Sequence, residues 1–414
     1  GESYKRIVAE AAKKAIGDTN IIERVFIVEL FLDKNKPNQI AGAAGFSVRE
    51  NKVYIIKCKT CMIACGGAVN IYQPRSVGEG KGRAWYPVWN SGSTYYLGAK
   101  VGAELSMMEN RFTPARFKDG YGPVGAWFLL FKAKTLNGLG ENFAASEAAK
   151  KELQKYAPYG TAAITPTCLR NHLMLFEMKE GRGPIMMDTV TALAELGKTM
   201  DKKELKHLES EAWEDFLDMT CGQANLWCAT NTEPEKKNSE VMPTEPYLLG
   251  SHSGCCGFWV SGPDFDWIPA SYKIKAANGK VYNRMTTVDG LFTSGDGVGC
   301  SGHKFSSGSH AEGRMVAKQL VRYAKDNTSF KPELALSKAQ IVDLVYKPVR
   351  TYLANCSYST HDDFNPNYIK PNGMMYRMMK ATHEYGAGTA TFYMTTNKNL
   401  EIIMEMLAWM REDC

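Results

Sequence analysis

The sequence predicts an α+β chain in which one mixed domain is split by a helical insertion and followed by further helices. Three observations support this: β-rich runs lie between residues 20 and 64, strand-like runs return near residue 257, and the stretch between them is mostly helical. Helical periodicity dominates again from Lys331 on. We therefore expect residues 1–112 and 248–330 to form one domain, 113–247 an inserted domain and 331–414 a helical domain.

The first elements are a helix and a three-stranded meander. Residues 4–16 carry apolar side chains at helical spacing, and Gly17 is the expected C-cap. Three β-rich runs separated by turn residues then predict antiparallel strands. These runs are Asn20–Asp33, Ile40–Arg49 and Lys52–Ala64. The last run ends in Cys65, Gly66 and Gly67, where the strand must turn sharply.

The later elements follow from the same patterns. A short helix is expected over 91–105, and the clearest helices of the insertion are Ser146–Tyr156, Cys168–Glu180 and Lys202–Asp218. Strands are expected at Gly257–Ser261, Ala270–Ile274 and Gly290–Ser294, followed by a helix over Ser309–Ala324. The last helices are Glu333–Tyr346, Met374–Glu384 and Leu400–Arg411.

Charge and composition limit the partners. With 50 Lys+Arg against 44 Asp+Glu, the net charge of +6 is mild and forms no basic stripe, which favours small anionic ligands over nucleic acid. No apolar run approaches the roughly 20 residues of a membrane-spanning helix, so no membrane insertion is expected. Eleven cysteines in 414 residues are no disulfide framework, and we expect a cytoplasmic protein. The missing initiator Met and the end at Cys414 indicate a piece of a longer chain.

Two motifs have competing interpretations. Cys58, Cys61 and Cys65 are spaced like zinc or iron–sulfur ligands, but strand alternation places Cys58 opposite the other two and no fourth ligand is near. We therefore predict buried strand cysteines and no metal site. The run 297–302 reads G-x-G-x-x-G, yet no strand follows its helix, as a Rossmann fingerprint requires. Small residues around Asp296 would still let backbone approach a cofactor closely.

Three further stretches could bind an anion. The segment from Arg111 to Trp127 combines arginines, glycines and aromatics, which is typical of an anion-binding loop and equally of a solvated loop. His252 lies among small residues, where it could face a ligand or serve a structural role. Arg170 is expected at a helix N-terminus, against the favourable dipole direction, which hints at an anionic partner.

Taken together, these stretches resemble the fumarate reductase/succinate dehydrogenase flavoprotein superfamily. The run 61–68 resembles its A-T-G-G turn, 250–257 its H-x-x-x-G-G segment, and 291–296 its flavin-contacting strand. Arg170 and the Glu-Gly-Arg-Gly at 180–183 match its substrate-side helix. Longer motifs at 70–80, 82–86, 115–125 and 297–313 are similar to the α subunits of dissimilatory adenylylsulfate reductases.

This resemblance implies an α/β FAD-binding domain of the fumarate reductase type, an inserted capping domain at 113–247 and an incomplete helical domain. The family's N-terminal βαβ unit for the ADP half of FAD would lie upstream of Gly1, and its helical domain would continue past Cys414. Cys65 departs from the family, whose members usually carry Ala or Thr there.

The resemblance also implies an oxidoreductase activity. The family reduces adenosine 5′-phosphosulfate (APS) to sulfite and AMP, or runs the reverse in sulfur oxidisers, through attack of flavin N5 on sulfur to give a flavin–sulfite adduct. FAD is the implied cofactor. The implied partner is an iron–sulfur β subunit whose [4Fe–4S] clusters deliver electrons within an αβ heterodimer or a higher assembly.

Site roles carry over residue by residue. The resemblance implies that Arg116 and His252 are the catalytic residues on the sulfate side and that Trp85 walls this pocket. Gly125, Leu129 and Arg170 match positions that hold the nucleotide. The implied flavin-binding residues are Gly66, Gly67, Asp296, Gly308, Ser309 and His310, the last three opening a helix.

Two alternatives stay open at this point. A fumarate reductase, succinate dehydrogenase or L-aspartate oxidase relative would keep the fold but is expected to carry a dicarboxylate-binding Thr/Glu pair in place of the loop Phe117–Gly125. A non-enzymatic alternative is an inactive binding or scaffold piece, because half of the FAD site is expected outside this chain. The sequence does not determine the physiological direction of the reaction.

Overall fold

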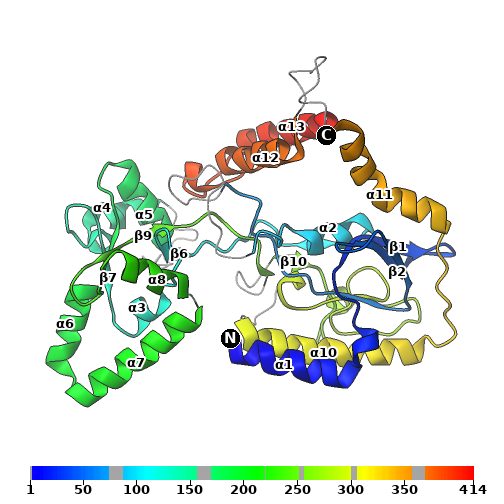
Figure 1. Ribbon diagram of the computed structural model, residues 1–414, viewed down its shortest axis with the longest axis horizontal. Helices are drawn as coiled ribbons and strands as arrows, with labels where there is room; N and C mark the ends of the chain where they lie inside the picture. Colours follow the sequence, from blue (N-terminus) through cyan, green and yellow to red (C-terminus); the bar gives the residue numbers. More distant parts are fainter. Residues whose placement is uncertain are drawn as a thin grey trace.

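The computed structural model describes residues 2–73, 87–155, 169–219, 221–250, 256–299, 305–356 and 369–414. In it the chain forms two lobes joined by a narrow connection (Figure 1). The first lobe contains the N-terminal strands and the helix Phe305–Asp326, and the inserted lobe contains the strands and helices from Ala115–Phe117 to Ser239–Pro243. Among the described residues, no helix is both long and apolar enough to cross a membrane.

The N-terminal helix and an antiparallel three-stranded meander form as predicted, although the third strand is shorter than expected. Helix α1 (Glu2–Ile16) is followed by Gly17, whose φ of 79° is a left-handed conformation that favours glycine. Strands β1 (Val25–Asp33), β2 (Lys36–Ser47) and β3 (Val53–Lys57) form one antiparallel sheet in the order β1-β2-β3. Their inner side chains join α2 (Ser93–Lys100), the helix predicted over 91–105, in one hydrophobic core.

The third β-rich run is not one strand, contrary to the prediction. It stops at Lys57, and β4 (Cys61–Ile63) pairs in parallel with β11 (Leu291–Thr293) in a different sheet. The cause is a change of hydrogen-bond partner: the Cys58 N–H still donates to Ala41 O of the meander, whereas the Cys61 N–H donates to Gly290 O at 3.0 Å. Apolar residues continue through this change, so periodicity alone could not show it.

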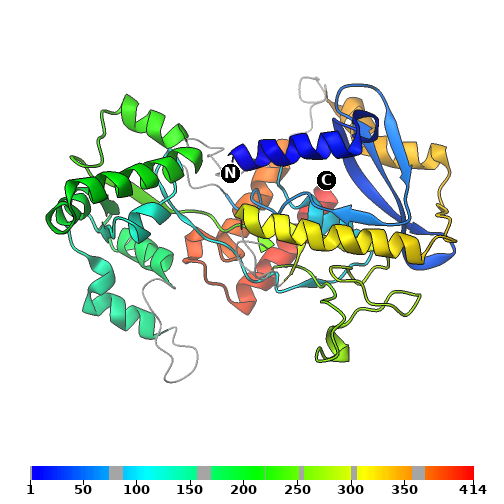
Figure 2. The same cartoon turned by 90° about the horizontal axis from the view of Figure 1, so that it is seen from below.

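The second half of the first lobe departs from the prediction at one run. Strands β5 (Leu105–Ser106) and β10 (Gly257–Phe258) pair as a short ladder, but Ala270–Tyr272 is a 3₁₀ turn, so the strand expected at Ala270–Ile274 is wrong. A second 3₁₀ turn (Gly295–Gly297) follows β11. The long helix α10 (Phe305–Asp326) lies beside α1 across the lower face of the lobe (Figure 2).

The inserted lobe contains a sheet that the sequence analysis missed. Strands β6 (Ala115–Phe117), β7 (Lys134–Leu136), β8 (Met186–Asp188) and β9 (Ser239–Pro243) lie in the order β6-β9-β8-β7. Three of them have only three residues, too few to show alternation. The helices are α3 (Gly125–Leu129), α4 (Glu147–Gln154), α5 (Arg170–Lys179), α6 (Thr189–Thr199), α7 (Lys202–Met219) and α8 (Cys221–Ala229), of which α4, α5 and α7 were predicted.

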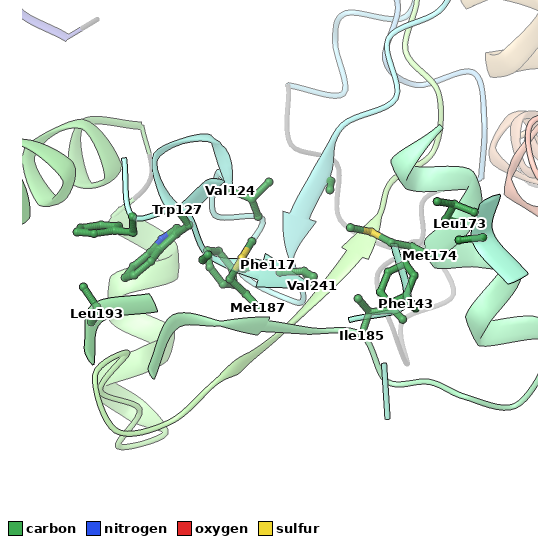
Figure 3. Packing of buried hydrophobic residues seen from close by; sticks show 14 of the residues in the cluster. Phe117, Val124, Trp127, Phe143, Leu173, Met174, Ile185, Met187, Leu193 and Val241 are labelled. Atoms are coloured by element: carbon green, nitrogen blue, oxygen red, sulfur yellow. The ribbon is translucent and has the colours of Figure 1, made fainter. Parts of the chain in front are cut away.

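The inserted lobe has its own hydrophobic core (Figure 3). Phe117 of β6 is fully buried and makes edge-on contacts with Trp127 and Trp227, at ring-centroid distances of 6.4 and 5.1 Å. Met187 and Val241 of the neighbouring strands complete the cluster around it. This core fixes β6 and α3, the two elements that carry three of the predicted substrate residues, Arg116, Gly125 and Leu129.

The C-terminal helices are confirmed, with one shifted start. Helix α11 (Lys338–Asn355) begins five residues after Glu333, at a capping box in which Ser337 and Gln340 bond each other's backbone N–H. It packs on the meander through Ile341 and Val345. Helices α12 (Pro371–Tyr385) and α13 (Asn397–Asp413) instead pack against each other. The domain limits at 112, 247 and 330 therefore stay a proposal.

Candidate functional site

The split β-rich run builds the first part of the site. Because β4 and β11 are parallel, their carboxyl ends lie at one edge, and the turn Cys65–Gly67 meets the turn Gly295–Gly297 there. Thr293 Oγ1 donates to Ile63 O at 2.9 Å, and Thr94 Oγ1 of α2 donates to Gly66 O at 2.6 Å. Two motifs 230 residues apart in sequence thus form one surface, which we name the double turn.

The glycines of the double turn serve different purposes. Gly66 has φ +79°, a left-handed conformation that favours glycine. A Cβ on Gly67 would overlap the carbonyl oxygen of Leu248 and lie 2.7 Å from Leu249 Cδ2, so this glycine allows two backbones to approach. Gly295 has φ +63°, and among the described residues only Ser309 Oγ of α10, at 3.8 Å, is near the position of its Cβ. No other described residue occupies the space over Gly295.

Asp296 lies half-buried in the double turn, where the resemblance placed a flavin contact. Its carbonyl oxygen accepts from Tyr95 OH at 2.9 Å. Burial, with smaller contributions from nearby Cys256 and Asp296, raises the pKa of the Tyr95 phenol, so this tyrosine remains a hydrogen-bond donor. The bond holds the turn to α2.

The helix that follows begins earlier than predicted. Because α10 starts at Phe305, Ser309 and His310 lie in its second turn, where backbone N–H groups bond carbonyls of the same helix. The expectation that 308–310 open the helix is therefore wrong. Gly308 is buried, Ser309 is exposed beside Gly295, and the His310 ring contacts Tyr4 of α1 with centroids 6.0 Å apart. Their role toward a flavin stays a prediction.

Arg116 lies in the middle of β6. Its neighbours Ala115 and Phe117 point into the core of the inserted lobe, so strand alternation turns Arg116 to the other face of the sheet. Only 6% of the residue is exposed. In the register it lies opposite Met242 and bridges Pro123. Because so little of the residue is exposed, the Arg116 side chain is poorly hydrated, which suits anion recognition.

Helix α3, which carries Gly125 and Leu129, contacts Arg170 through Phe128. Gly125 and Leu129 are four residues apart on α3, so they share a helix face; Leu129 is 71% exposed, and a Cβ on Gly125 would meet no atom of the described residues within 4 Å. The Arg170 guanidinium carbon, at the start of α5, lies 4.3 Å from the centroid of the Phe128 ring. Among the described residues nothing accepts from the buried Nε of Arg170, and burial lowers the pKa of this guanidinium.

A cavity of about 360 Å³ adjoins Arg170. Three segments line it: 109–113 before β6, 169–172 at the start of α5, and 392–394 of the C-terminal region. The Asn171 amide nitrogen donates to Thr113 O, so the amide oxygen points the other way and has no partner among the described residues. Two residues that line the cavity thus each have one buried polar atom without a partner among the described residues, Nε of Arg170 and Oδ1 of Asn171.

Two predicted residues, Trp85 and His252, lie outside the described residues. The run 297–302 is described only to Gly299. Cβ atoms on Gly297 and Gly299 would overlap Thr293 and Ser106 side chains, so these two glycines serve packing. The packing of Thr293 and Ser106 therefore explains these two glycines without a dinucleotide-binding motif.

The cysteine motif differs from its prediction. Because β3 ends at Lys57, Cys58 and Cys61 do not sit on one strand, and their thiols hydrogen-bond each other, which lowers the pKa of Cys58 and raises that of Cys61. Cys65 is exposed and not buried. Within the described ranges, no cluster of three or more His, Cys, Asp or Glu side chains could hold a metal ion.

Sequence reasoning missed Arg111 as a connecting residue. It noted this arginine only as part of an anion-binding stretch, whereas its acceptors are Tyr72 and the carbonyls of residues 386, 387 and 393. A partner some 275 residues away leaves no local signal.

Comparison with known proteins identifies the class first. No family model matches the chain. Its fold matches E. coli quinol fumarate reductase with a TM-score of 0.54 at 16% identity, over 94% of this chain and 56% of the other. The chain thus has the α+β fold of the fumarate reductase type of flavoprotein, as predicted.

The particular family follows from two much nearer matches. A solved adenosine-5-phosphosulfate reductase in complex with sulfite (covalent adduct) is 51% identical with a TM-score of 0.87, over 100% of this chain and 63% of that one. Adenylylsulfate reductase subunit alpha from Megalodesulfovibrio gigas is 62% identical over 410 residues, which cover 98% of this chain and 62% of the relative. The chain is similar over nearly its whole length to adenylylsulfate reductase α subunits, and it spans somewhat less than two thirds of that relative's length.

Proposed function

We propose that this chain forms the flavin-facing and substrate-facing part of an adenylylsulfate reductase, which converts APS to sulfite and AMP or runs the reverse. The observation that carries this proposal is the nucleotide surface: Arg170 stacked on Phe128, beside open space over Gly125. A relative that is 51% identical over the whole chain has been solved with covalently bound sulfite, which supports the substrate class.

The double turn fits the flavin half of FAD. Gly295 leaves open space, Asp296 offers a half-buried carboxylate that can accept from hydroxyl groups, and Ser309 adds an exposed hydroxyl beside them. Gly66 allows the left-handed turn, and Gly67 allows the backbone of the turn to approach the backbone of Leu248. When bound, FAD supplies the two electrons of the reaction. The ADP half has no counterpart assigned in this chain.

The reaction breaks the bond between the sulfur and the bridging phosphate oxygen of APS. Sulfur gains two electrons and leaves as sulfite, while AMP leaves as a phosphate anion. An electron-rich reductant must therefore approach an anionic sulfate, which demands fixed cationic and N–H donors on the sulfonyl oxygens. Arg116 is buried and can provide such charge. We assign His252 first to charge stabilisation and second to proton transfer, and Trp85 to the wall of this pocket.

The AMP end is assigned to the other surface. The guanidinium of Arg170 has an unpaired Nε that can donate to a phosphate or ribose oxygen, and its aromatic support on Phe128 keeps it in place. Gly125 leaves room for the nucleoside, and Leu129 offers an exposed apolar contact. Binding of the AMP end of APS positions the sulfate group, although the AMP-binding residues take no part in the chemistry.

Electrons must come from outside this chain. We propose an iron–sulfur β subunit with [4Fe–4S] clusters as the donor, in an αβ heterodimer, because the relative is named an α subunit. A gene for a small ferredoxin-like protein next to the gene of this chain would support the pairing. The cytoplasmic location stays a prediction.

Sulfite titration of the flavin tests the function. In the FAD-loaded holoprotein, sulfite should bleach the flavin absorbance, and both Arg116→Ala and His252→Ala should weaken that response about tenfold or more, since a lost hydrogen bond to a charged group corresponds to about 1.5–3 kcal/mol. Lys325→Ala, at the far end of α10, is the matched control and should bleach like the wild type. Bleaching that is unchanged in both site variants would contradict the sulfate-site assignment.

A further inference from the structure

Two chain crossings connect the inserted lobe to the rest of the molecule, and they pair with each other. Phe112 and Tyr247 exchange backbone hydrogen bonds of 2.8 Å, and the Thr244 N–H donates to Pro114 O at 2.9 Å. We name this pair of segments, 111–114 and 244–248, the hinge ribbon. Any change in the orientation of the inserted lobe must bend it.

Residues 386–394, between α12 and α13, form what we call the C-terminal loop. It contacts the first strand of the hinge ribbon through Arg111. Arg111 Nη1 donates to Ala387 O at 2.6 Å and to Gly386 O at 3.2 Å, and Nη2 donates to Tyr393 O at 3.4 Å. The same Nη1 donates to Tyr72 OH at 3.0 Å, and this hydroxyl in turn donates to Gly386 O at 2.8 Å.

The C-terminal loop also reaches the second strand and the inserted lobe. Tyr393 OH donates to Thr244 O at 2.8 Å. Phe392 meets α5 at two points: its ring lies edge-on to the His172 ring with centroids 6.0 Å apart, and the Lys179 ammonium lies 4.9 Å above its ring centroid. One loop therefore touches both hinge strands and the helix that begins with Arg170.

The backbone of this loop depends on these contacts. Ala387, Phe392 and Tyr393 have φ of 61°, 57° and 64°, a left-handed conformation that is unfavourable for residues other than glycine. Arg111 accounts for two of the three, since it binds the carbonyls of Ala387 and Tyr393. Without it, the loop loses the partners that stabilise this conformation.

We propose that Arg111 is a positioning residue: through the C-terminal loop it fixes the orientation of the inserted lobe and so places Arg170 relative to the double turn. This inference rests on the proposed function for its ligand. The cavity of about 360 Å³ lies between the loop and the start of α5, so a nucleotide there contacts both sides. Nucleotide binding and loop docking therefore stabilise each other.

The test uses two measurements on the holoprotein. Arg111→Met should raise the hydrogen exchange of the Phe112, Thr244 and Tyr247 amides and weaken AMP binding, each about tenfold, which corresponds to about 1.4 kcal/mol. Arg111→Lys should restore part of both effects. Tyr393→Phe is a milder change that removes the bond from the C-terminal loop to Thr244 O of the second hinge strand, so it should raise exchange and weaken AMP binding to a smaller extent. Its effects should not add to those of Arg111→Lys, because both act through one loop.

Arg322→Met is the matched control. Arg322 also stacks on a tyrosine and donates to a backbone carbonyl, at Val281, but far from the loop. Equal effects of Arg111→Met and Arg322→Met, or unchanged hinge exchange in Arg111→Met and Tyr393→Phe, would overturn the proposal. If the wild type does not bind AMP, the proposed function fails. In that case, hydrogen exchange of the hinge-ribbon amides alone tests whether Arg111 is a positioning residue.

Discussion

Arg170 and Phe128 hold each other in place across two helices, with the guanidinium carbon 4.3 Å from the ring centroid. The arginine begins α5 and the phenylalanine lies in α3, so this contact joins two segments that are separated by 42 residues. Arg170 also lines the cavity of about 360 Å³. A fixed cation next to open space is the arrangement on which the proposed nucleotide site depends.

Replacing Arg170 tests this arrangement. Arg170→Ala should raise the dissociation constant for AMP about 10- to 100-fold, since hydrogen bonds to charged groups are worth about 1.5–3 kcal/mol. Arg170→Lys should recover little, because a lysine lacks the planar fork that stacks on Phe128. Isothermal titration of AMP measures both, and an Arg170→Ala protein with wild-type affinity would refute the assignment.

Gly125 gives a prediction in which stability and binding separate. A methyl group there meets no atom within 4 Å in the part of the chain that the structure describes, so Gly125→Ala should keep or slightly raise the free energy of unfolding, by up to about 1 kcal/mol. The same methyl group occupies the proposed nucleotide space and should weaken AMP binding about tenfold. Gly313→Ala, which is equally open in α10, should leave AMP binding unchanged. Normal binding in Gly125→Ala would place the nucleotide elsewhere.

A substitution at Gly67 should lower the free energy of unfolding, in contrast to Gly125→Ala. Gly67→Ala forces a Cβ onto the carbonyl oxygen of Leu248, so the two chain segments that meet at the double turn must separate. We expect a loss of about 1–3 kcal/mol in the free energy of unfolding. Cys65→Ala, two residues away and exposed, should change it by less than about 0.5 kcal/mol. Denaturant titration compares the two, and similar stability of both variants would contradict the structure of the turn.

One ion pair predicts a pH dependence. Arg182 donates to both carboxylate oxygens of Glu177 at 2.8 Å and thereby lowers the pKa of this glutamate, and Asn137 adds a further bond. Since the pKa is lower in the folded state, the pair stabilises the protein above the ordinary glutamate pKa, and this stabilisation is lost as the pH falls through the folded value. The stability difference between the wild type and Arg182→Met should therefore be full at pH 7 and shrink toward pH 3. A difference that is constant over this range would show that the charge of Glu177 is not involved.

The fold was predictable where patterns are long. Helices α5, α7, α12 and α13 and the meander follow from periodicity, because each spans enough residues to show it. The sheet of the inserted lobe does not, since strands such as Ala115–Phe117 are too short. The change of sheet after Lys57 depends on Gly290, more than 200 residues later, and no local pattern reports such a partner.

The site was predictable only through family motifs. Those motifs assigned Gly125, Leu129 and Arg170 to one nucleotide site, and in the structure Phe128 of α3 contacts Arg170, while the assignment itself stays a prediction. They did not mark Arg111, whose role depends on carbonyl groups of the C-terminal loop. They also misplaced the start of α10, because Gly308 and Ser309 look like a helix start while the helix already begins at Phe305.

Single-turnover chemistry tests the central claim most directly. The chemically reduced holoprotein is mixed with APS in one experiment and with fumarate in another, and flavin reoxidation, AMP and sulfite are measured. We predict one AMP and one sulfite per reoxidised flavin with APS, and no reoxidation with fumarate. Reoxidation by fumarate, or no AMP release from APS, would contradict the claim that this flavoprotein fold acts on a sulfonucleotide.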